Sequence, residues 1–432
     1  MSSLTVLSHN SPSPAGGEPS KTRQSARPGP AATRHKNDTN NLVSCSIPTY
    51  SKKIPYLIVL ASSNQLYSGT GTALFEWVRF AKDYFDFAIC IDNRISLNYK
   101  IARDFCRAED LCFLPCGPQS WGGGADPGNA MAPLHVGSGR WPVVEFVSWA
   151  NTTVNLDILD SCPPGVHLIY TPHTQPAWTM PNAKHFWALE HGFNRMLSSS
   201  HLVCCDSPAE VEAVLQRTPK AKATYIPIGV DTSRFCLGNT HRELRILVIA
   251  DFNETRKRTD LNLAAIHRLL HRNPACNATL AGRNSDMVKV PTEIAERVEL
   301  LGFVSATNLL ELYQKSSLFL LLSDYEAFGI PIVEALCCGT PVVTTRTREA
   351  RSLFRDLPGC HLVDNTDNAA VDSAIDKAIS NSQYENIGRA AAARFNLEKA
   401  FTIKLGAIQK LLSCHPQNGS TREVSSMISS VI

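Results

Sequence analysis

The 432-residue sequence has no long hydrophobic segment and no strong net charge. Its longest apolar stretches, YLIVLA from residue 56 and LFLLL from residue 318, are far shorter than the roughly 18 residues of a membrane-spanning helix. The N-terminus lacks the apolar core of a signal peptide. The formal net charge is only +3, and the longest basic run has three residues, 256 to 258. We therefore expect neither a membrane-spanning protein nor a nucleic-acid-binding one.

The sequence also lacks any C-x-x-C pair, although it contains 14 cysteines. The closest cluster is Cys106, Cys112 and Cys116, with no histidine among them, so free thiols are favoured over a zinc site. Five other cysteines lie inside apolar runs, where a thiol behaves as a small hydrophobic group: Cys90, Cys204, Cys205, Cys337 and Cys338. This use of cysteine predicts a reducing compartment.

The length and the composition, with 44% hydrophobic and 19% charged residues, predict two ordinary α/β domains. Residues 1–50 are rich in Ser, Pro, Thr, Asn and Arg, which predicts a disordered extension, with an organellar transit peptide as the alternative. We place the domains and their connections as follows: an N-terminal Rossmann-like domain at 51–236, a polar linker at 237–243, a second Rossmann-like domain at 244–400, and a C-terminal helix and tail at 401–432.

Strand-like segments alternate with helical patterns or turns in both halves. The first half contains PYLIVLAS, FAICID, LCFLP, VHLIYTP and HLVCCDS, and the second contains LRILVIA, ATLAG, VELLGF, LFLLLS and TPVVTT. This alternation predicts an α/β fold of two doubly wound domains, whose parallel sheets face each other across a cleft. One interruption, residues 117–142, is too rich in Gly and Pro to be a regular element; it is either a mobile loop near a site or a neutral insertion.

The stretch YEAFGIPIVEALCCGTPVV, residues 325–343, combines two acids with the start of a helix. Pro331 marks the first helical turn, and Gly329 lets the backbone approach a ligand closely. Free backbone N–H groups at a helix start bind anions, whereas Glu326 and Glu334 can accept hydrogen bonds from hydroxyls. An ordinary helix start explains either glutamate alone, but the whole string predicts a site for a sugar nucleotide.

This string resembles the E-x7-E signature of retaining glycosyltransferases with the GT-B fold, the family 4 or group 1 glycosyl transferases. IPIGVDTSRF is similar to the segment that precedes the family's interdomain linker, and residues 298–345 follow the family's order almost throughout. The resemblance is strong over about 225–356 and continues in pattern over about 55–224. It implies a GT-B fold and a hexosyltransferase-like activity, with the configuration of the sugar retained.

The resemblance also implies roles for residues of the second domain. Glu326 would face the donor sugar, and Glu334 would bind the ribose of the nucleotide. Lys257 would contact the diphosphate, assisted by the backbone amides of Gly329 and Ile330.

Further roles follow for both halves of the chain. The turn that ends at Val304 would pack against the nucleotide base. In the first domain, Gly69 and Gly71 match the glycine-containing loop that approaches the donor phosphate and the acceptor. His173 matches a cleft histidine close to the reacting sugar.

One position departs from the family's pattern. Members usually carry an arginine six positions before the lysine, directed at the diphosphate, and here that position is Asp251. An acid next to a diphosphate is repulsive. Either Arg256, Arg258 or Arg283 supplies the missing positive charge, or the enzyme is weakened or inactive.

These observations predict an enzyme that moves a sugar from a UDP-, GDP- or ADP-sugar to a hydroxyl of a glycan, a lipid-linked or a small-molecule acceptor. We expect no cofactor and no metal, because side chains and the helix start can neutralise the phosphates. The expected location is cytoplasmic, with peripheral contact at the inner face of a membrane as a further expectation. The alternatives are a nucleotide-sugar epimerase of the same fold and an inactive sugar-nucleotide binder.

Overall fold

The computed structural model describes most of the chain between residues 53 and 414. The described ranges are 53–61, 69–92, 100–116, 140–149, 156–175, 186–239 and 241–414. The predicted N-terminal extension, nearly all of the Gly- and Pro-rich segment 117–142, and the predicted C-terminal tail lie outside these ranges. None of the described helices is long and apolar enough to cross a membrane.

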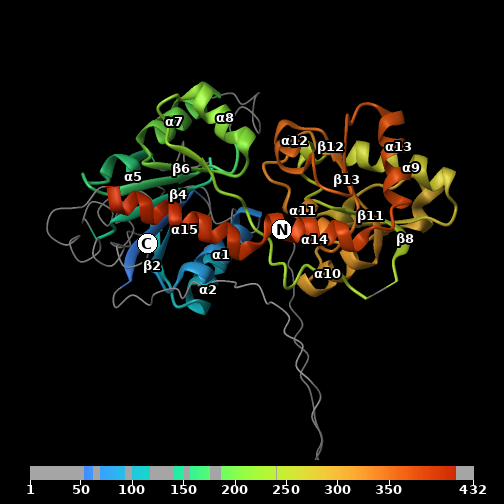
Figure 1. Cartoon of the computed structure of the whole chain (residues 1–432), viewed down its shortest axis with the longest axis horizontal. Helices are drawn as coiled ribbons and strands as arrows, with labels where there is room; N and C mark the ends of the chain where they lie inside the picture. The colour runs from blue at the N-terminus through green and yellow to red at the C-terminus, as the bar shows by residue number, and fades with distance from the viewer. Residues whose placement is uncertain are drawn as a thin grey trace, which may run out of the picture. The chain divides into compact units, whose positions relative to one another are not determined.

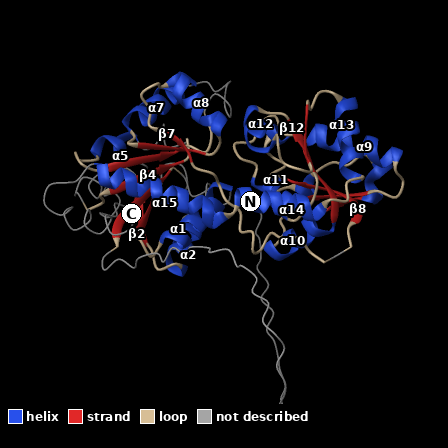
Figure 2. Ribbon diagram, in the orientation of Figure 1, coloured by secondary structure: helices blue, strands red, loops and turns tan. Residues whose placement is uncertain are grey.

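The first half of the chain forms a seven-stranded parallel sheet (Figures 1 and 2). Its strands lie in the order β3-β2-β1-β4-β5-β6-β7. They are β1 (Ile54–Leu60), β2 (Phe85–Asp92), β3 (Cys112–Cys116), β4 (Val143–Val147), β5 (His167–Thr171), β6 (Leu202–Cys205) and β7 (Ala223–Tyr225). The connecting helices are α1 (Gly69–Ala81), α2 (Lys100–Ala108), α5 (Leu156–Ser161), α7 (Phe186–Ser199) and α8 (Pro208–Arg217).

Alternate residues of the central strand β1 face two different hydrophobic cores. Tyr56 and Ile58 pack in a cluster with residues of α1, whereas Leu57 and Val59 pack in a second cluster with residues of α7. Side chains on a strand alternate between the two faces of its sheet, so helices cover both faces. Burial on both faces explains why the strand is one continuous apolar run.

The second half forms a six-stranded parallel sheet in the order β10-β9-β8-β11-β12-β13. Its strands are β8 (Glu243–Ile249), β9 (Asn277–Ala281), β10 (Val298–Leu300), β11 (Ser316–Leu321), β12 (Val342–Thr345) and β13 (Cys360–Val363). Its helices are α9 (Thr259–Arg272), α10 (Ala306–Lys315), α11 (Ile330–Cys337), α12 (Arg348–Phe354), α13 (Asn368–Ile379) and α14 (Tyr384–Phe395), with 3₁₀ turns η3 (Thr255–Lys257), η4 (Ser285–Met287) and η5 (Thr292–Arg297). The predicted fold of two doubly wound domains is confirmed.

Three strands were not predicted, β4, β7 and β13. The strand β7 has only three residues, and none of them is buried. The central residue of β4 is Glu145, and a charged residue inside a short run hides a buried strand from an apolar-run criterion. The strand β13 has only four residues, and most of them are half-buried. The segments VHLIYTP and HLVCCDS are therefore the fifth and sixth strands of the first sheet, not the fourth and fifth.

Most of the cysteines named above are free thiols as expected, but Cys90 is not. Cys204, Cys205, Cys337 and Cys338 are buried and free, whereas Cys90 is disulfide-bonded. The prediction for Cys90 as a free thiol is wrong, because the sequence does not show which cysteines face each other in the fold.

The last described helix, α15 (Leu397–Cys414), packs on the first domain, where it lies along α1 (Figure 1). Phe401 of α15 meets the rings of Trp77 and Phe80, with centroids 5.5 and 5.3 Å apart. The chain enters α15 beside its earlier crossing between the domains: the N–H of Leu397 donates to the carbonyl of Val230 at 3.1 Å. The two domains are thus connected by two adjacent, hydrogen-bonded passes of the chain.

A buried ion pair fixes α15 to the centre of the first sheet. Lys404 Nζ lies 2.8 Å from Glu145 Oε1 and 4.6 Å from the centre of the Trp77 ring. Tyr56 donates its hydroxyl to the other carboxylate oxygen at 2.6 Å. Burial alone would raise the pKa of Glu145, but Lys404 and the hydroxyls of Thr171 and Tyr56 lower it below its ordinary value. The charged carboxylate is therefore fully compensated inside the domain.

Replacing Lys404 with methionine should lower the free energy of unfolding by about 3–5 kcal/mol, because Glu145 is then left buried without its partner. Lys410→Met, at an exposed position of the same helix, is the matched control and should change little. Urea denaturation of the three proteins measures the effect. A Lys404→Met variant as stable as the control would contradict this account of the pair.

Candidate functional site

The candidate site lies at the carboxyl ends of β8 and β11, which are neighbours in the second sheet. The chain leaves β8 toward α9, which packs in one hydrophobic core, and leaves β11 toward α11, which packs in the other. The two connections therefore diverge to opposite faces of the sheet. Such a switch point opens a crevice beyond the strand ends, and ligands of doubly wound sheets bind there.

Lys257 and Glu326 meet above this point, one from each connection. Lys257 Nζ donates to Glu326 Oε1 at 2.7 Å, and Ser323 donates its hydroxyl to the same oxygen at 2.7 Å. Each charged side chain is 11% exposed. Burial alone would raise the pKa of Glu326, but Lys257 and then Arg256 lower it below its ordinary value. The structure thus brings together a positive and a negative group at the carboxyl ends of β8 and β11.

Arg256 also joins the two connections. Its guanidinium donates to the carbonyl of Tyr325 at 3.0 Å and lies 3.8 Å from the Glu326 carboxylate. Its other nitrogen contacts Glu254 at 2.5 Å. Arg256 is therefore the arginine nearest to the Lys257–Glu326 pair among the three that were considered as replacements.

Asn262, which the sequence analysis did not single out, holds the two connections in place. Its amide donates to the carbonyls of Lys257 and Arg258, each at 2.9 Å, and its oxygen accepts the N–H of Leu322 at 3.0 Å. The residue is 2% exposed. A buried asparagine at the start of a helix after a basic loop was the available signal, because such an amide needs several partners.

The start of α11 provides backbone donors beside this pair. Gly329 precedes the helix with φ 81°, a left-handed conformation that favours glycine, and Pro331 stands in the first turn. Gly69, at the start of α1 in the first domain, lies beside Ile330: a Cβ placed on Gly69 would be 3.2 Å from Ile330 Cδ1. Gly69, Gly329 and Ile330 are thus close together, whereas Gly71 is buried within α1.

Glu334 lies one turn into α11, and its partner is a tyrosine. Tyr313 of α10, which is fully buried, donates its hydroxyl to Glu334 Oε2 at 2.8 Å. Burial raises the pKa of Glu334 to about 7, although the hydrogen bond from Tyr313 and the charge of Arg234 oppose the rise. As whole residues the two glutamates of the string are each 8% exposed, but their pKa values shift in opposite directions, because only Glu326 has a lysine partner.

Asp251, which stands where the family usually has an arginine, is neutralised by one of the candidate arginines. Arg283 Nη1 lies 3.2 Å from Asp251 Oδ2, and the other oxygen of Asp251 accepts the N–H of Asn253 at 3.1 Å. Arg258 binds Asp324 and Asp260 at 2.9 and 2.8 Å. Both arginines are therefore engaged with acids of their own.

Two other predicted residues, Val304 and His173, are not among the hydrogen-bond or ion-pair partners of Lys257 and Glu326 in the described part of the chain. Val304 follows β10 in a loop where the adjacent Phe303 is 87% exposed. His173 follows β5 in the first domain, where its Nδ1 lies 2.9 Å from Asp206 Oδ2. Asp206 was not predicted, since no pattern connects it with a histidine 33 residues earlier.

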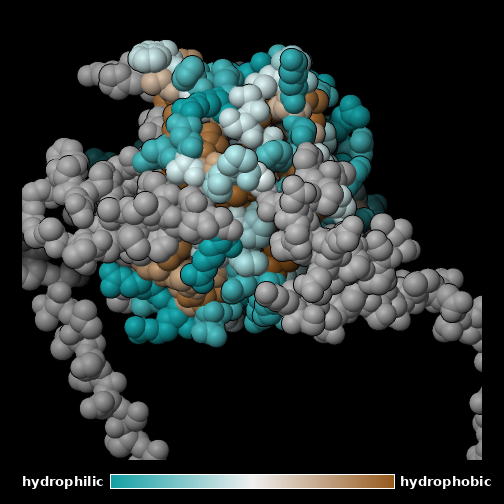
Figure 3. All heavy atoms as spheres, turned by 90° about the vertical axis from the view of Figure 1, so that its left-hand side faces the viewer, coloured by the Kyte–Doolittle hydropathy of each residue, from teal (hydrophilic) through white to brown (hydrophobic). Residues whose placement is uncertain are grey.

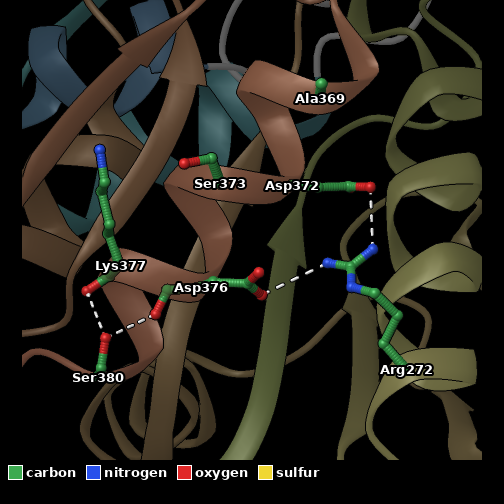
Figure 4. Close-up of a pocket in the computed structure, with 7 residues that line it drawn as sticks. All are labelled: Arg272, Ala369, Asp372, Ser373, Asp376, Lys377 and Ser380. Atoms are coloured by element: carbon green, nitrogen blue, oxygen red, sulfur yellow. Dashed lines mark hydrogen bonds and ion pairs between the residues drawn. The ribbon is translucent and has the colours of Figure 1, made fainter.

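A hollow between α9 and α13 is lined by acids that already have a basic partner, so we assign no ligand to it. Its acids, Asp372 and Asp376, face Arg272, with contacts of 2.9 and 3.4 Å (Figure 4). The remaining lining residues are small, apart from Lys377. Within the part of the chain that the structure describes, no group of three or more His, Cys, Asp or Glu side chains could hold a metal ion.

Comparison with protein families assigns this region. Residues 230–394, which carry β8 to α14 and the Lys257–Glu326 pair, match the family described as "Glycosyl transferases group 1". This match covers less than half of the chain, and the matched stretch is hereafter the group 1 domain. The first domain lies outside this match.

Curated relatives of the group 1 domain are distant. The chain is 24% identical to mannosylfructose-phosphate synthase of Agrobacterium fabrum over 216 residues, 41% of this chain and 48% of that protein. It is 28% identical to D-inositol 3-phosphate glycosyltransferase of Geodermatophilus obscurus over 202 residues, 41% of this chain and 45% of that protein. The chain thus spans about half the length of the curated relatives it matches.

Solved structures extend the likeness in fold beyond the group 1 domain. The Anabaena protein HepE, solved in complex with UDP and glucose, has a TM-score of 0.66 at 17% identity and covers 83% of this chain and 100% of its own. Sucrose-phosphate synthase from Thermosynechococcus elongatus has a TM-score of 0.64 at 16% identity, with 84% and 100% covered. At these identities the comparison supports the two-domain GT-B fold alone.

The raised pKa of Glu334 in the group 1 domain predicts a pH-dependent stability. Since the ordinary pKa is 4.5 and the folded one about 7, the folded state holds more protons between these values. The free energy of unfolding should therefore fall as pH rises through this window, by on the order of 3 kcal/mol from this group. Glu334→Gln keeps an acceptor for Tyr313 and removes the titration.

Urea denaturation at pH 5 and pH 8 compares the variant with the unaltered protein. We expect a smaller loss of stability in Glu334→Gln across this range. An identical loss in both proteins would show that Glu334 does not titrate in the folded state as assigned.

Proposed function

We propose that the protein transfers a sugar from a nucleoside-diphosphate sugar to an acceptor hydroxyl, with retention at the anomeric carbon, as a family 4 glycosyltransferase. The observation that carries this proposal is the contact of Lys257 with Glu326 at the switch point, next to the start of α11. The group 1 match of residues 230–394 supports it, as does the UDP and glucose bound to the similarly folded HepE.

The chemistry follows from where charge develops. Breaking the bond between sugar and diphosphate leaves negative charge on the diphosphate and positive character on the sugar ring. Lys257 and the backbone amides at the start of α11 would stabilise the first, since donors aimed at a developing charge stabilise the transition state most. Glu326, kept charged by its neighbours, would orient the sugar hydroxyls and stabilise the second.

Glu334 would bind the ribose hydroxyls of the donor. Its second carboxylate oxygen is already occupied by Tyr313, which fixes the orientation of the carboxyl group on α11. A hydroxyl pair of the ribose would then hydrogen-bond to a group whose geometry is set before binding. The donor base, the sugar and the acceptor class are left to experiment, with UDP-, GDP- and ADP-sugars as the starting panel.

Lys257→Ala should lower kcat with a confirmed sugar donor, because it removes a preorganised hydrogen-bond donor to the diphosphate. The expected loss of transition-state stabilisation is about 2–4 kcal/mol. Release of nucleoside diphosphate from the panel of UDP-, GDP- and ADP-sugars measures the rate. Lys315→Ala is the matched control, because Lys315 lies partly exposed at the end of α10, where it pairs with Glu311. Unchanged turnover in Lys257→Ala would remove the role assigned to this lysine.

Glu334→Gln should weaken binding of the free nucleoside diphosphate by about 1–3 kcal/mol, because an amide accepts hydrogen bonds from the ribose less strongly than a carboxylate. Isothermal titration calorimetry at pH 8 measures this effect, at a pH where the carboxylate is ionised in the unaltered protein. Equal affinities of the two proteins would refute the assignment to the ribose.

A second candidate, a catalytically inactive sugar-nucleotide binder, is favoured by one observation. The position at which the family has a diphosphate-binding arginine holds Asp251, and Arg283 is engaged in neutralising it. This reading predicts that a nucleoside diphosphate raises the melting temperature by mass action while no donor of the panel is consumed. Consumption of any donor, with the sugar transferred to a hydroxyl, decides for the transferase.

A further inference from the structure

His173 occupies a strained position at the carboxyl edge of the first sheet. Its φ is 57°, a left-handed conformation that is unfavourable for a residue other than glycine. Its side chain is 14% exposed and lines a cavity of about 40 Å³ together with Trp77, Val147 and Phe401. Figure 3 views the molecule from the side of this domain, where hydrophilic residues are interspersed with small hydrophobic areas.

The imidazole of His173 is held by one ring nitrogen. Its Nδ1 lies 2.9 Å from Asp206 Oδ2, and the Asp206 side chain is only 3% exposed. A carboxylate can only accept hydrogen bonds, so the proton of this contact belongs to Nδ1. Nε2 is then the nitrogen left for a ligand, and among the described residues the ring has no other hydrogen-bond partner.

Asp206 is itself fixed by the start of α8. Its backbone N–H donates to Glu210 Oε2 at 2.7 Å, and the N–H of Glu210 donates to the hydroxyl of the N-cap residue Ser207 at 3.1 Å. Burial and then the neighbouring Asp206 raise the pKa of Glu210 well above its ordinary value, which favours the neutral form of Glu210. Two hydrogen bonds of the helix cap therefore fix the backbone at Asp206, from which its carboxylate extends.

We propose that Asp206 is a positioning residue for His173: it holds the imidazole as the Nδ1–H tautomer and presents Nε2 as a hydrogen-bond acceptor to the reacting substrate. The inference rests on the proposed function for its catalytic consequence. The ring nitrogen left for a ligand is thereby fixed before binding, so a hydroxyl of the donor or acceptor can donate to it. The backbone strain at His173 and the burial of Asp206 favour such a positioning role over that of an ordinary surface ion pair.

The first arm of the test is independent of any substrate. Nitrogen-15 chemical shifts of the His173 ring, assigned by comparison with His173→Gln, report which nitrogen carries the proton. We expect the Nδ1–H tautomer in the unaltered protein and in Asp206→Asn, whose amide oxygen can still accept, and a mixture of tautomers in Asp206→Ala. An Nε2–H tautomer in the unaltered protein would overturn the inference.

The second arm uses the donor that the nucleotide-sugar panel identifies. We expect Asp206→Ala to lower kcat by about 10- to 100-fold with KM for the donor changed less than about twofold, and Asp206→Asn to recover part of the loss. Asp160→Asn, at an exposed position paired with Arg195, is the matched control and should leave both constants unchanged. A role confined to stability would lower the melting temperature of Asp206→Ala without this loss of kcat, and would overturn the inference.

Failure of the proposed function is distinguishable from failure of this inference. If the unaltered protein consumes no donor, the proposed function is wrong, and the tautomer alone then decides whether Asp206 positions the ring. If it consumes a donor and Asp206→Ala is equally active, the proposed function stands and the inference is wrong.

Discussion

The contact of Lys257 with Glu326 depends on the order of the strands in the second sheet. Only because β8 and β11 are adjacent, and are followed by helices on opposite faces, can a lysine and a glutamate 69 residues apart meet over the strand ends. The charge of Lys257 lowers the cost of burying the Glu326 carboxylate and lowers its pKa in a mostly enclosed place. Asn262 extends the same constraint to the backbone, since one buried amide ties both connections together.

The cations around the candidate site mostly have acidic partners. Arg283 faces Asp251, Lys257 faces Glu326, and Arg258 faces two acids. A ligand bearing two negative charges therefore finds few cations without a partner, and the backbone amides at the start of α11 gain importance. The pairing of Asp251 with Arg283 is the physical basis of the second candidate function, an inactive sugar-nucleotide binder.

Much of the fold could be predicted from the sequence, because buried parallel strands are continuous apolar runs and helices have distinct start signals. β1 and β11 are such runs, and Gly329 with Pro331 marks the start of α11. Strand β4 could not be found this way, because its central Glu145 is compensated by Lys404, 259 residues later. The same limit applies to the site: the string from residue 325 pointed to Glu326, but Asp206 and Asn262 act through partners that are distant in sequence.

The two adjacent passes between the domains have a mechanical consequence. Val230 accepts from Leu397 and donates to the carbonyl of Phe395, so the outgoing and returning segments are joined edge to edge. A Cβ on Gly229 would lie 2.3 Å from the Cα of Leu397, too near for any side chain. Neither pass can bend without the other, and a bulkier residue at 229 would act as a wedge, altering the angle between the halves while leaving Lys257, Glu326 and their partners unchanged.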